Sequence, residues 1–435
     1  MTLFRSLNRS LLMIRLKILK LFKSRFFSNS VWLYLLQIFN TVMPLLTLPY
    51  VTRIFGAERY GVFSIAFNIY GYIQVIIEYG FIMSATRKMA INPNDMNMAS
   101  RLFSSVFIAR ILLALLCTAM TVLYILIFHD YSAKTACLFI MSLCSFGYCL
   151  QINWFFQGIS DMKYISLTTI FARSFILLCI FIFVKSSSDI YLYSFLMTIL
   201  PIVYGSVGLI IANKKYSLHF TYVSFQTVID ELKDGFLVFT TSFSSKILSS
   251  VGITLLAFFA DASEVGIYSA IQKIPNIMVF IWFPLGQILY PIASRKMTES
   301  FIDGKKFVYK MRKLIMLPFM LLVITISLLS KQIIRIAFGN EFIIYYYWCI
   351  PLLLWLLVAI NNNFLGHQIL IGGGFDKSYS KCFQITICAS MLINFTLIYF
   401  FRGDGASLSP LLSELLLTFL ELREINKIER KECVK

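Results

Sequence analysis

The stretch that decides the fold class is residues 102–128, which read LFSSVFIARILLALLCTAMTVLYILIF. Arg110 is its only charged residue. The stretch is long enough to cross the hydrocarbon core of a bilayer, which takes about 20 apolar residues in a helix. A surface helix of a soluble protein carries charged residues along one face, and this stretch has no such face. It therefore predicts a transmembrane helix.

The composition of the whole chain agrees with this stretch. Of the 435 residues, 59% are apolar and 14% are charged, whereas soluble domains have about 45–50% apolar and about 25% charged residues. The excess falls in runs of nearly uncharged residues along the chain. This pattern excludes a soluble enzyme and a disordered or nucleic-acid-binding chain, although the net charge is +18.

Hydropathy read in windows of about 19 residues predicts twelve transmembrane helices. They cover residues 29–51, 62–86, 102–128, 135–156, 164–184, 190–212, 237–260, 265–294, 314–330, 346–371, 382–401 and 406–421. The connections between them are too short for a sizeable soluble domain. The predicted fold class is therefore an all-α integral membrane protein.

The basic residues predict the orientation of the chain. An even number of spans puts both termini on one side, and the segments on that side carry 28 of the 39 basic residues. The loops on the opposite side carry 7. Because Lys and Arg accumulate in cytoplasmic segments, both termini are predicted to be cytoplasmic. Most of the net charge is then an orientation signal.

Residues 1–28 form a separate segment at the amino terminus. Seven basic residues interrupt an apolar series that includes Leu11, Ile14 and Ile18. A signal peptide would instead have an uninterrupted apolar core. The pattern favours a basic amphipathic helix on an anionic lipid surface. The alternative is a basic tail that only fixes the topology.

Two short sequence patterns recur half a chain apart. GVFS at residues 61–64 is matched by GIYS at residues 266–269, and GISDMKY at residues 158–164 is matched by GGFDKSY at residues 373–379. Both pairs relate predicted helices that are six apart. Internal repeats of this kind are common in transporters, whose sites lie between the repeats near the bilayer midplane. They predict two parallel six-helix lobes around a central cavity.

The repeat and the charge pattern together predict five segments. These are a cytoplasmic basic amphipathic segment at 1–28, an N-terminal lobe at 29–212, a cytoplasmic linker at 213–236, a C-terminal lobe at 237–421 and a cytoplasmic tail at 422–435.

Ionisable residues inside the predicted spans mark candidate sites, because each costs about 2.5–3.5 kcal/mol to insert at the centre of a membrane helix. They are the cations Arg110, Arg173, Lys246 and Lys273, and the acids Glu78 and Glu414. Four cations against two acids favour an anionic ligand such as phosphate. Lys246 and Lys273 are the preferred candidates. Alternatively, the acids form structural ion pairs with two of the cations, or side chains near the span ends reach the interface.

Polar residues also interrupt the tenth span. They are Asn361, Asn362, Asn363, His367 and Gln368. Such side chains can contact sugar hydroxyls in a cavity, but in membranes they more often form hydrogen bonds between helices. Both roles stay open from the sequence.

Prolines in the eighth span predict helix kinks. Pro275, Pro284 and Pro291 each remove a backbone donor. The resulting bend either flexes during transport or only shapes the packing. Elsewhere, no cysteine or histidine spacing suits a metal, and no phosphate-binding loop is present. The sequence therefore predicts neither a metal nor a cofactor.

Several segments resemble a known family. LQIFNTVMPLLTLPYVTRIFGAERYG at residues 36–61, EYGF at 78–81 and SATRK at 84–88 closely resemble the amino-terminal signature of bacterial O-antigen flippases. These belong to the polysaccharide transporter family of the multidrug/oligosaccharidyl-lipid/polysaccharide superfamily. WFFQG at residues 154–158 and EVGIYSAIQKIPN at residues 264–276 are similar as well. The likeness covers roughly residues 30–420, and only the long basic start departs from the family.

The resemblance implies a two-lobed helical transporter with a V-shaped cavity. Its substrate would be an oligosaccharide repeat unit linked through diphosphate to undecaprenol. The unit would move from the cytoplasmic to the periplasmic leaflet of the bacterial inner membrane by alternating access, without an enzymatic step or a cofactor.

The resemblance also implies which residues and partners take part. Basic residues that line the cavity would hold the diphosphate, and by position Arg53 and Arg87 join the four intramembrane cations. Membrane lipids, a polysaccharide polymerase and the chain-length machinery are the implied partners.

Three alternative functions remain from the sequence. A drug or metabolite antiporter of the same superfamily would carry more acidic than basic residues in its cavity. A membrane glycan polymerase or ligase would have a large periplasmic loop with catalytic residues, whereas the longest external connection, residues 331–345, is short. A scaffold subunit of a glycan assembly complex has no distinguishing sequence feature.

Overall fold

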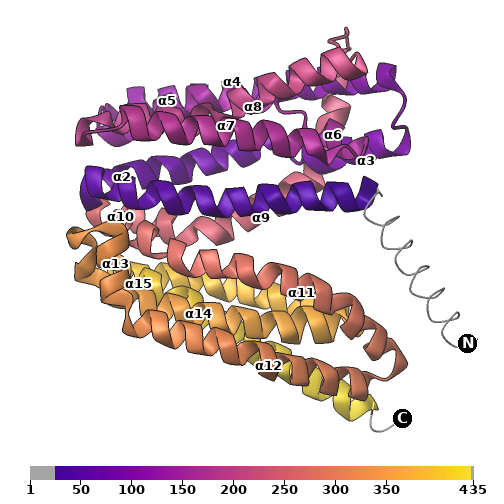
Figure 1. Ribbon diagram of the computed structural model, residues 1–435, viewed down its shortest axis with the longest axis vertical. Helices are drawn as coiled ribbons and strands as arrows, with labels where there is room; N and C mark the ends of the chain where they lie inside the picture. Colours follow the sequence, from indigo (N-terminus) through magenta and orange to yellow (C-terminus); the bar gives the residue numbers. More distant parts are fainter. Residues whose placement is uncertain (1–24, 433–435) are drawn as a thin grey trace, which may run out of the picture. The chain divides into compact units, whose positions relative to one another are not determined.

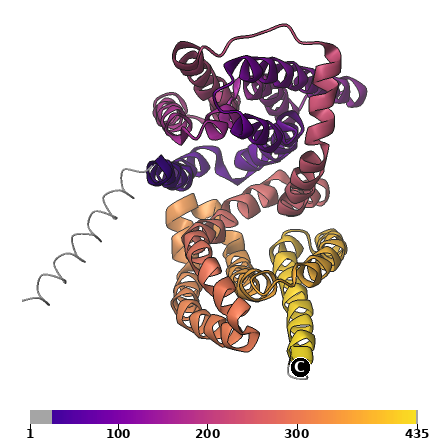
Figure 2. The same cartoon turned by 90° about the vertical axis from the view of Figure 1, so that its right-hand side faces the viewer.

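The computed structural model describes residues 25–432, and their secondary structure is entirely helical (Figure 1, Figure 2). Ten helical stretches of these residues are long and apolar enough to cross a membrane. The chain is therefore a multi-pass membrane protein. The predicted amphipathic segment at 1–28 lies, apart from its last residues, outside the described part of the chain.

The helices follow one another with short connections. In chain order they are α2 (Arg25–Glu78), α3 (Phe81–Ile91), α4 (Met96–Phe128), α5 (Ala133–Cys144), η1 (Ser145–Leu150), α6 (Asn153–Gly158), α7 (Met162–Phe183), η2 (Ser187–Asp189), α8 (Ile190–Tyr216), α9 (Phe225–Phe259), α10 (Ala262–Ile271), α11 (Lys273–Glu299), α12 (Phe301–Leu328), α13 (Ser330–Phe338), η3 (Asn340–Trp348), α14 (Cys349–Asn362), η4 (Asn363–Ile371) and α15 (Asp376–Glu432). Of the short elements, η1, η2 and η3 are 3₁₀-helical, and η4 is π-helical.

Two helices are broken by a single residue. α2 has 54 residues and α15 has 57, so each would measure about 80 Å or more if straight, against about 30 Å for the hydrocarbon core. Gly56 (φ 67°, ψ −178°) interrupts α2, and Arg402 (φ 46°, ψ −120°) interrupts α15. Each break divides its helix into two segments, and glycine adopts such a conformation without a side-chain clash.

Several segments differ from the expected boundaries. The fourth predicted span is divided among α5, η1 and α6, and α9 already begins at Phe225, within the expected linker at 213–236. α13 occupies part of the connection at 331–345. Its sequence, SKQIIRIAF, is not apolar enough to predict a membrane span. Its apolar residues recur with helical spacing, however, which is typical of an amphipathic helix.

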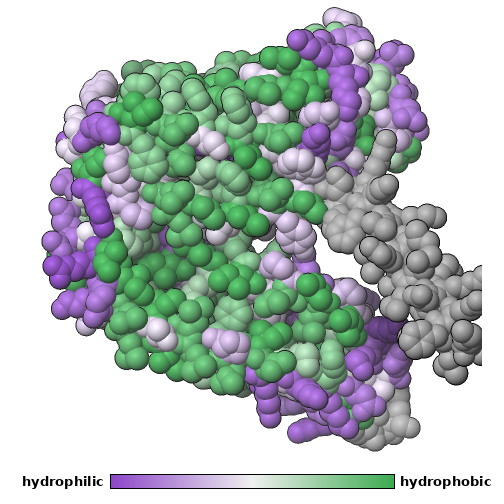
Figure 3. All heavy atoms as spheres, viewed as in Figure 1, coloured by the Kyte–Doolittle hydropathy of each residue, from purple (hydrophilic) through white to green (hydrophobic). Residues whose placement is uncertain are grey.

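The described residues form two compact units. The first contains the residues up to Leu45 together with Tyr70–Lys185 and Tyr191–Ser245. The second contains Leu46–Ile69, Ser186–Ile190 and the residues from Lys246 onward. Within each unit, apolar side chains cover the middle of the helices and hydrophilic ones gather toward their ends (Figure 3). This distribution is that of helices embedded in a bilayer.

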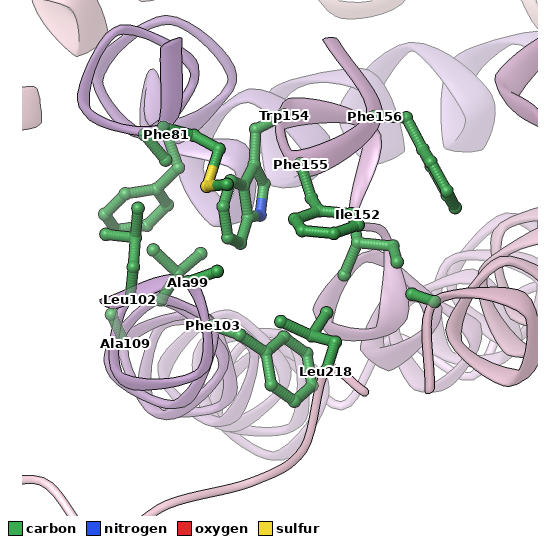
Figure 4. Packing of buried hydrophobic residues seen from close by; sticks show 14 of the residues in the cluster. Phe81, Ala99, Leu102, Phe103, Ala109, Ile152, Trp154, Phe155, Phe156 and Leu218 are labelled. Carbon is green, nitrogen blue, oxygen red and sulfur yellow. The ribbon is translucent and has the colours of Figure 1, made fainter. Parts of the chain in front are cut away.

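Aromatic residues of the short helix α6 build the core of the first unit. Trp154, Phe155 and Phe156 are at most 2% exposed, and they lie in one cluster with Phe81 of α3 and Phe103 of α4 (Figure 4). Burial of each such ring contributes about 2–3 kcal/mol. This cluster fixes α3, α4 and α6 against one another and so positions the polar side chains that follow on α4.

Glycines bring α10 against α2 within the second unit. A Cβ on Gly61 would lie 1.6 Å from the carbonyl oxygen of Ala262, and a Cβ on Gly266 would lie 2.1 Å from that of Ala57. Ala57 and Gly61 thus face Ala262 and Gly266, two pairs of small residues with the spacing that lets helices approach closely in membranes. The repeat patterns at residues 61–64 and 266–269 therefore pack directly on each other.

Candidate functional site

Two lysines of the second unit lie close enough to repel each other. Lys246 lies on α9 and is half-buried, and Lys273 is the first residue of α11 and is exposed. Both belong to predominantly apolar helices. Two cations so placed attract a group with more than one negative charge, and phosphate oxygens suit ammonium donors. The pair is the candidate anion site.

The prolines contribute to the local structure around Lys273. Pro275 lies in the first turn of α11, where its missing N–H is tolerated. α10 ends at Ile271 and α11 begins at Lys273, but Gln272 between them has helical dihedral angles (φ −59°, ψ −22°) and donates its N–H to Tyr268, so the helical path continues. Pro284 and Pro291 lie inside α11, whose helix continues through both. Lys273 therefore lies within one long helical stretch, Ala262–Glu299.

Arg110 binds the backbone of the interrupted fourth span. Its side chain is 3% exposed, and its Nη1 donates to the carbonyl oxygens of Tyr148 (3.0 Å) and Gln151 (2.6 Å). Tyr148 lies in η1, where its carbonyl oxygen also accepts from the N–H of Gln151 (3.3 Å), and Gln151 is the first residue after η1, where the helical hydrogen bonds end. A charged donor meets this need well. The geometry therefore supports a structural role for Arg110.

Replacing Arg110 with methionine should destabilise the protein by about 2–4 kcal/mol, because the carbonyl group of Gln151 loses its charged donor and that of Tyr148 keeps only the N–H of Gln151. Thermal unfolding of the detergent-purified protein measures the change. Arg87→Met is the matched control, since Arg87 lies exposed on α3. An equal loss in the two variants would contradict this role.

Glu78 and Arg173 surround Arg110 in the first unit. Glu78 accepts a hydrogen bond from Nε2 of Gln74 (3.1 Å) and attracts Arg110 electrostatically. Arg173, on α7, is half-buried and interacts electrostatically with Tyr148 and Tyr204. The structure thus gathers three of the predicted intramembrane ionisable residues into one polar cluster.

The polar residues of the tenth span divide between two environments. Asn362 is buried, and its Nδ2 donates to Oε2 of Glu414 (2.6 Å), while its Oδ1 accepts from Thr418 (2.6 Å). Gln368 is also buried and donates to the carbonyl oxygen of Gly286 (3.0 Å). These bonds join neighbouring helices, the commoner role of such residues. Asn361 and Asn363 are half-buried, and His367 is exposed.

Glu421 is a polar residue that the sequence analysis did not single out. It is 0% exposed, and its two carboxylate oxygens have no hydrogen-bond partner among the described residues. A Cβ on Gly366, in the π-helical element η4, would lie 2.4 Å from its Oε1. Glu421 follows Glu414 by two helical turns on α15, so the spacing of the two acids in the sequence could have indicated this residue. Its place at the end of the last predicted span concealed it.

Arg53 and Arg87, the two cations added by resemblance, are both exposed. Arg53 belongs to the second unit, where its Nη2 donates to the carbonyl oxygen of Ile336. Arg87 belongs to the first unit. Among the six predicted cations, the structure therefore brings Lys246 and Lys273 together in one unit, and Arg110 with Arg173 in the other.

Comparison with known proteins assigns the family. The family model described as "Polysaccharide biosynthesis protein" matches residues 26–297, which is more than half of the chain. The chain belongs to this family. A protein of Escherichia coli (strain K12) named "Putative O-antigen transporter" is 26% identical over 93% of this chain and 98% of its own length. A protein of the same name from Shigella dysenteriae is 24% identical over 91% and 99%.

Solved structures share the fold of this family member. A lipid II flippase, MurJ, in an inward closed conformation has a TM-score of 0.68 at 14% identity, over 92% of this chain and 87% of its own. An inward-facing multidrug resistance MATE transporter of the MOP superfamily has a TM-score of 0.67 at 12% identity, over 89% and 96%. The fold is thus that of MOP-superfamily transporters. The names of these four proteins describe transporters and a flippase, not enzymes.

Proposed function

We propose that this protein is a flippase for O-antigen repeat units linked through diphosphate to undecaprenol. It moves them from the cytoplasmic to the periplasmic leaflet of the bacterial inner membrane during lipopolysaccharide biosynthesis. The observation that carries the proposal is the similarity, over more than nine-tenths of the chain, to two proteins named as O-antigen transporters. The fold shared with a lipid II flippase supports it.

The chemistry of the second unit fits the charged part of this substrate. Lys246 and Lys273 together supply two positive charges for the diphosphate. Arg53 and Arg87, whose side chains are exposed, are proposed as further contacts of the diphosphate. Asn361, Asn363 and His367 offer hydrogen bonds to glycan hydroxyl groups, because they are not fully buried. Arg110 and Asn362 support the helices around these sites.

The proposed transport cycle is alternating access between two lobes of six helices. The breaks at Gly56 and Arg402 divide the two longest helical stretches, and the proposal lets each of these two stretches cross the membrane twice, which would raise ten crossings to twelve. Twelve crossings place both termini on one side, and the basic residues favour the cytoplasm. A reporter fused at residue 220 tests this orientation, since an external signal there would contradict it.

Deletion of the gene tests the function. Without the flippase, repeat units accumulate on the cytoplasmic side, and surface lipopolysaccharide loses its O-antigen until the intact gene is restored. The polymerase and chain-length machinery, which act on the flipped units, then lack their substrate. Normal surface O-antigen after deletion, in a strain without a second flippase, would refute the proposal.

A multidrug antiporter is the second candidate function, because the MATE structure has the same fold. Cationic drugs are repelled by Lys246 and Lys273, so the site favours the flippase. Susceptibility of the deletion strain to cationic dyes separates the two functions. A strain that becomes sensitive to dyes but keeps its O-antigen would establish the antiporter instead.

A further inference from the structure

Three lysines lie on one face of the first turns of α12. Lys306, Lys310 and Lys313 are all exposed. Their spacing of four and then three residues sets them one above the other along the helix, because side chains three and four positions apart share a helix face. Together they span about 10 Å of the helix axis. We call these three residues the lysine stripe.

The lysine stripe continues into an apolar face of the same helix. The spacing of three and four residues goes on through Leu317, Leu321 and Ile324, which are 59%, 58% and 48% exposed. The opposite face of α12 is buried, as at Val308 and Phe319. Because α12 is long and apolar enough to cross a membrane, an exposed face that carries only apolar side chains over these turns is suited to contact with acyl chains. The stripe is therefore turned toward lipid as well.

The stripe lies at the level of the lipid headgroups. The charged part of α12 ends at Lys313, and the residues from Leu314 to Leu328 are uncharged. Headgroup regions add about 5–8 Å to each side of the hydrocarbon core, and long lysine side chains near a span end turn toward this polar layer. Hydrophilic residues gather at the end of the second unit where α12 begins, next to its apolar surface (Figure 3). Headgroup phosphates are thus within reach of the stripe.

Neighbouring cations of α11 and α12 are held by groups of the protein itself. One donates to a carboxylate, and two lie over aromatic rings at the distances of cation–π contacts. These contacts are Lys305 with Glu429, Lys296 over Phe307 (5.1 Å to the centroid) and Arg312 over Tyr309 (4.8 Å).

The lysine stripe, in contrast, meets little negative charge. Among the described residues, the one carboxylate within 4 Å of its ammonium groups is that of Asp303, whose Oδ1 lies 3.6 Å from Nζ of Lys306. These two side chains are 73% and 74% exposed, so the pair contributes little to stability. The three ammonium groups repel one another, because like charges three and four residues apart destabilise a helix. The stripe therefore favours an anion from outside the protein.

The charged and apolar parts of this face together select the kind of anion. Ammonium groups bind phosphate oxygens through charge-assisted hydrogen bonds. A free phosphate ion would use the lysines alone, and a zwitterionic phospholipid brings a cation along with its phosphate. An anionic phospholipid brings an uncompensated phosphate to the stripe and acyl chains to Leu317 and Leu321. It therefore matches both parts.

We propose that the lysine stripe binds an anionic phospholipid. The phosphate accepts hydrogen bonds from the ammonium groups of the stripe, and the acyl chains lie along the apolar face of α12. The stripe contains none of the residues of the proposed diphosphate and glycan sites, so this role is independent of the transported substrate. It assigns a lipid class to one membrane partner of the protein.

Lipid binding to the purified full-length protein tests the proposal. Native mass spectrometry and thermal unfolding in a neutral detergent are compared for phosphatidylglycerol and phosphatidylcholine. Each lysine near an anionic lipid changes the affinity about fivefold, so we expect phosphatidylglycerol to bind at least about tenfold more tightly. A higher salt concentration should reduce this difference, because salt screens exposed charges. Equal binding of the two lipids would overturn the proposal.

A triple variant assigns the contact to the stripe. Replacing all three of its lysines with glutamine should remove most of the preference for phosphatidylglycerol. Glutamine is a good helix former, so the variant should fold, which its thermal unfolding without added lipid checks. The matched control removes three exposed lysines from three helices of the first unit and should keep the preference; it combines Lys163→Gln, Lys214→Gln and Lys233→Gln. An undiminished preference in the stripe variant, or an equal loss in the control, would refute the assignment.

Soluble glycerophosphoglycerol separates the headgroup from the whole lipid. It carries the same phosphate without acyl chains. We expect it to bind at least about tenfold more weakly than phosphatidylglycerol, because it lacks the apolar contacts. Equal affinity would show that the stripe takes a soluble phosphate and would overturn the assignment to a lipid.

Discussion

Replacing Gly61 with alanine should abolish the folded protein or reduce its stability by about 3 kcal/mol or more. The new Cβ would lie 1.6 Å from the carbonyl oxygen of Ala262. That atom belongs to the backbone of α10 and has no side-chain freedom with which to move away, so the helices would have to separate. Gly266→Ala should act similarly, because its Cβ would lie 2.1 Å from the carbonyl oxygen of Ala57.

Gly208→Ala is the matched control for this effect. Gly208 also lies within a helix, but its nearest neighbour would be 3.8 Å from the new Cβ, an ordinary contact. Alanine is a better helix former than glycine by about 1 kcal/mol, so this variant should be neutral or more stable. The yield of monodisperse protein after detergent extraction and its thermal unfolding measure the difference. A stable Gly61→Ala protein would disprove the close contact.

The double variant Lys246→Ala, Lys273→Ala should lose nearly all transport while keeping its fold. Each ammonium that contacts a phosphate contributes a charge-assisted hydrogen bond of about 1.5–3 kcal/mol, so each single variant should lose about tenfold to a hundredfold in affinity. Binding of undecaprenyl diphosphate to the purified protein measures the affinity. Restoration of surface O-antigen in the deletion strain measures transport.

Charge-preserving variants separate this role from a structural one. Lys246→Arg and Lys273→Arg keep the positive charge and should retain most of the binding, although arginine presents it in a different geometry. Lys163→Ala, at an exposed lysine in the first turn of α7 in the other unit, should bind as the unaltered protein does. Full binding and transport by the double alanine variant would remove these lysines from the site.

Much of the fold followed from local sequence. The apolar run at residues 102–128 predicted a membrane helix, and α4 spans Met96–Phe128. The polysaccharide family was predicted from the motifs at residues 36–61 and 154–158, and the family match confirmed it. These inferences succeed because hydropathy and helix length depend on consecutive residues. The twelve-helix count stays a prediction beside the ten long helical stretches.

The candidate site was harder to predict from the sequence than the fold, because the roles of its residues depend on how the helices pack. The sequence marked Arg110 and Lys246 alike as cations within spans, but only the structure shows that Arg110 donates to the carbonyl groups of Tyr148 and Gln151. The same holds for Asn362, whose amide is engaged by Glu414. Glu421 was missed because it lies at the end of the last predicted span, and its close approach to Gly366 of η4 is formed only when the chain folds.

The sequence by itself determined the membrane class, the family and the list of polar residues that apolar helices carry. The tertiary structure decided which of those residues bond to the backbone or to other side chains, as Arg110 and Asn362 do. It also decided that the recurring glycines at Gly61 and Gly266 face each other across a backbone contact. The physical reason is that hydropathy acts along one helix, whereas hydrogen-bond satisfaction and close packing depend on partners that the chain brings together only when it folds.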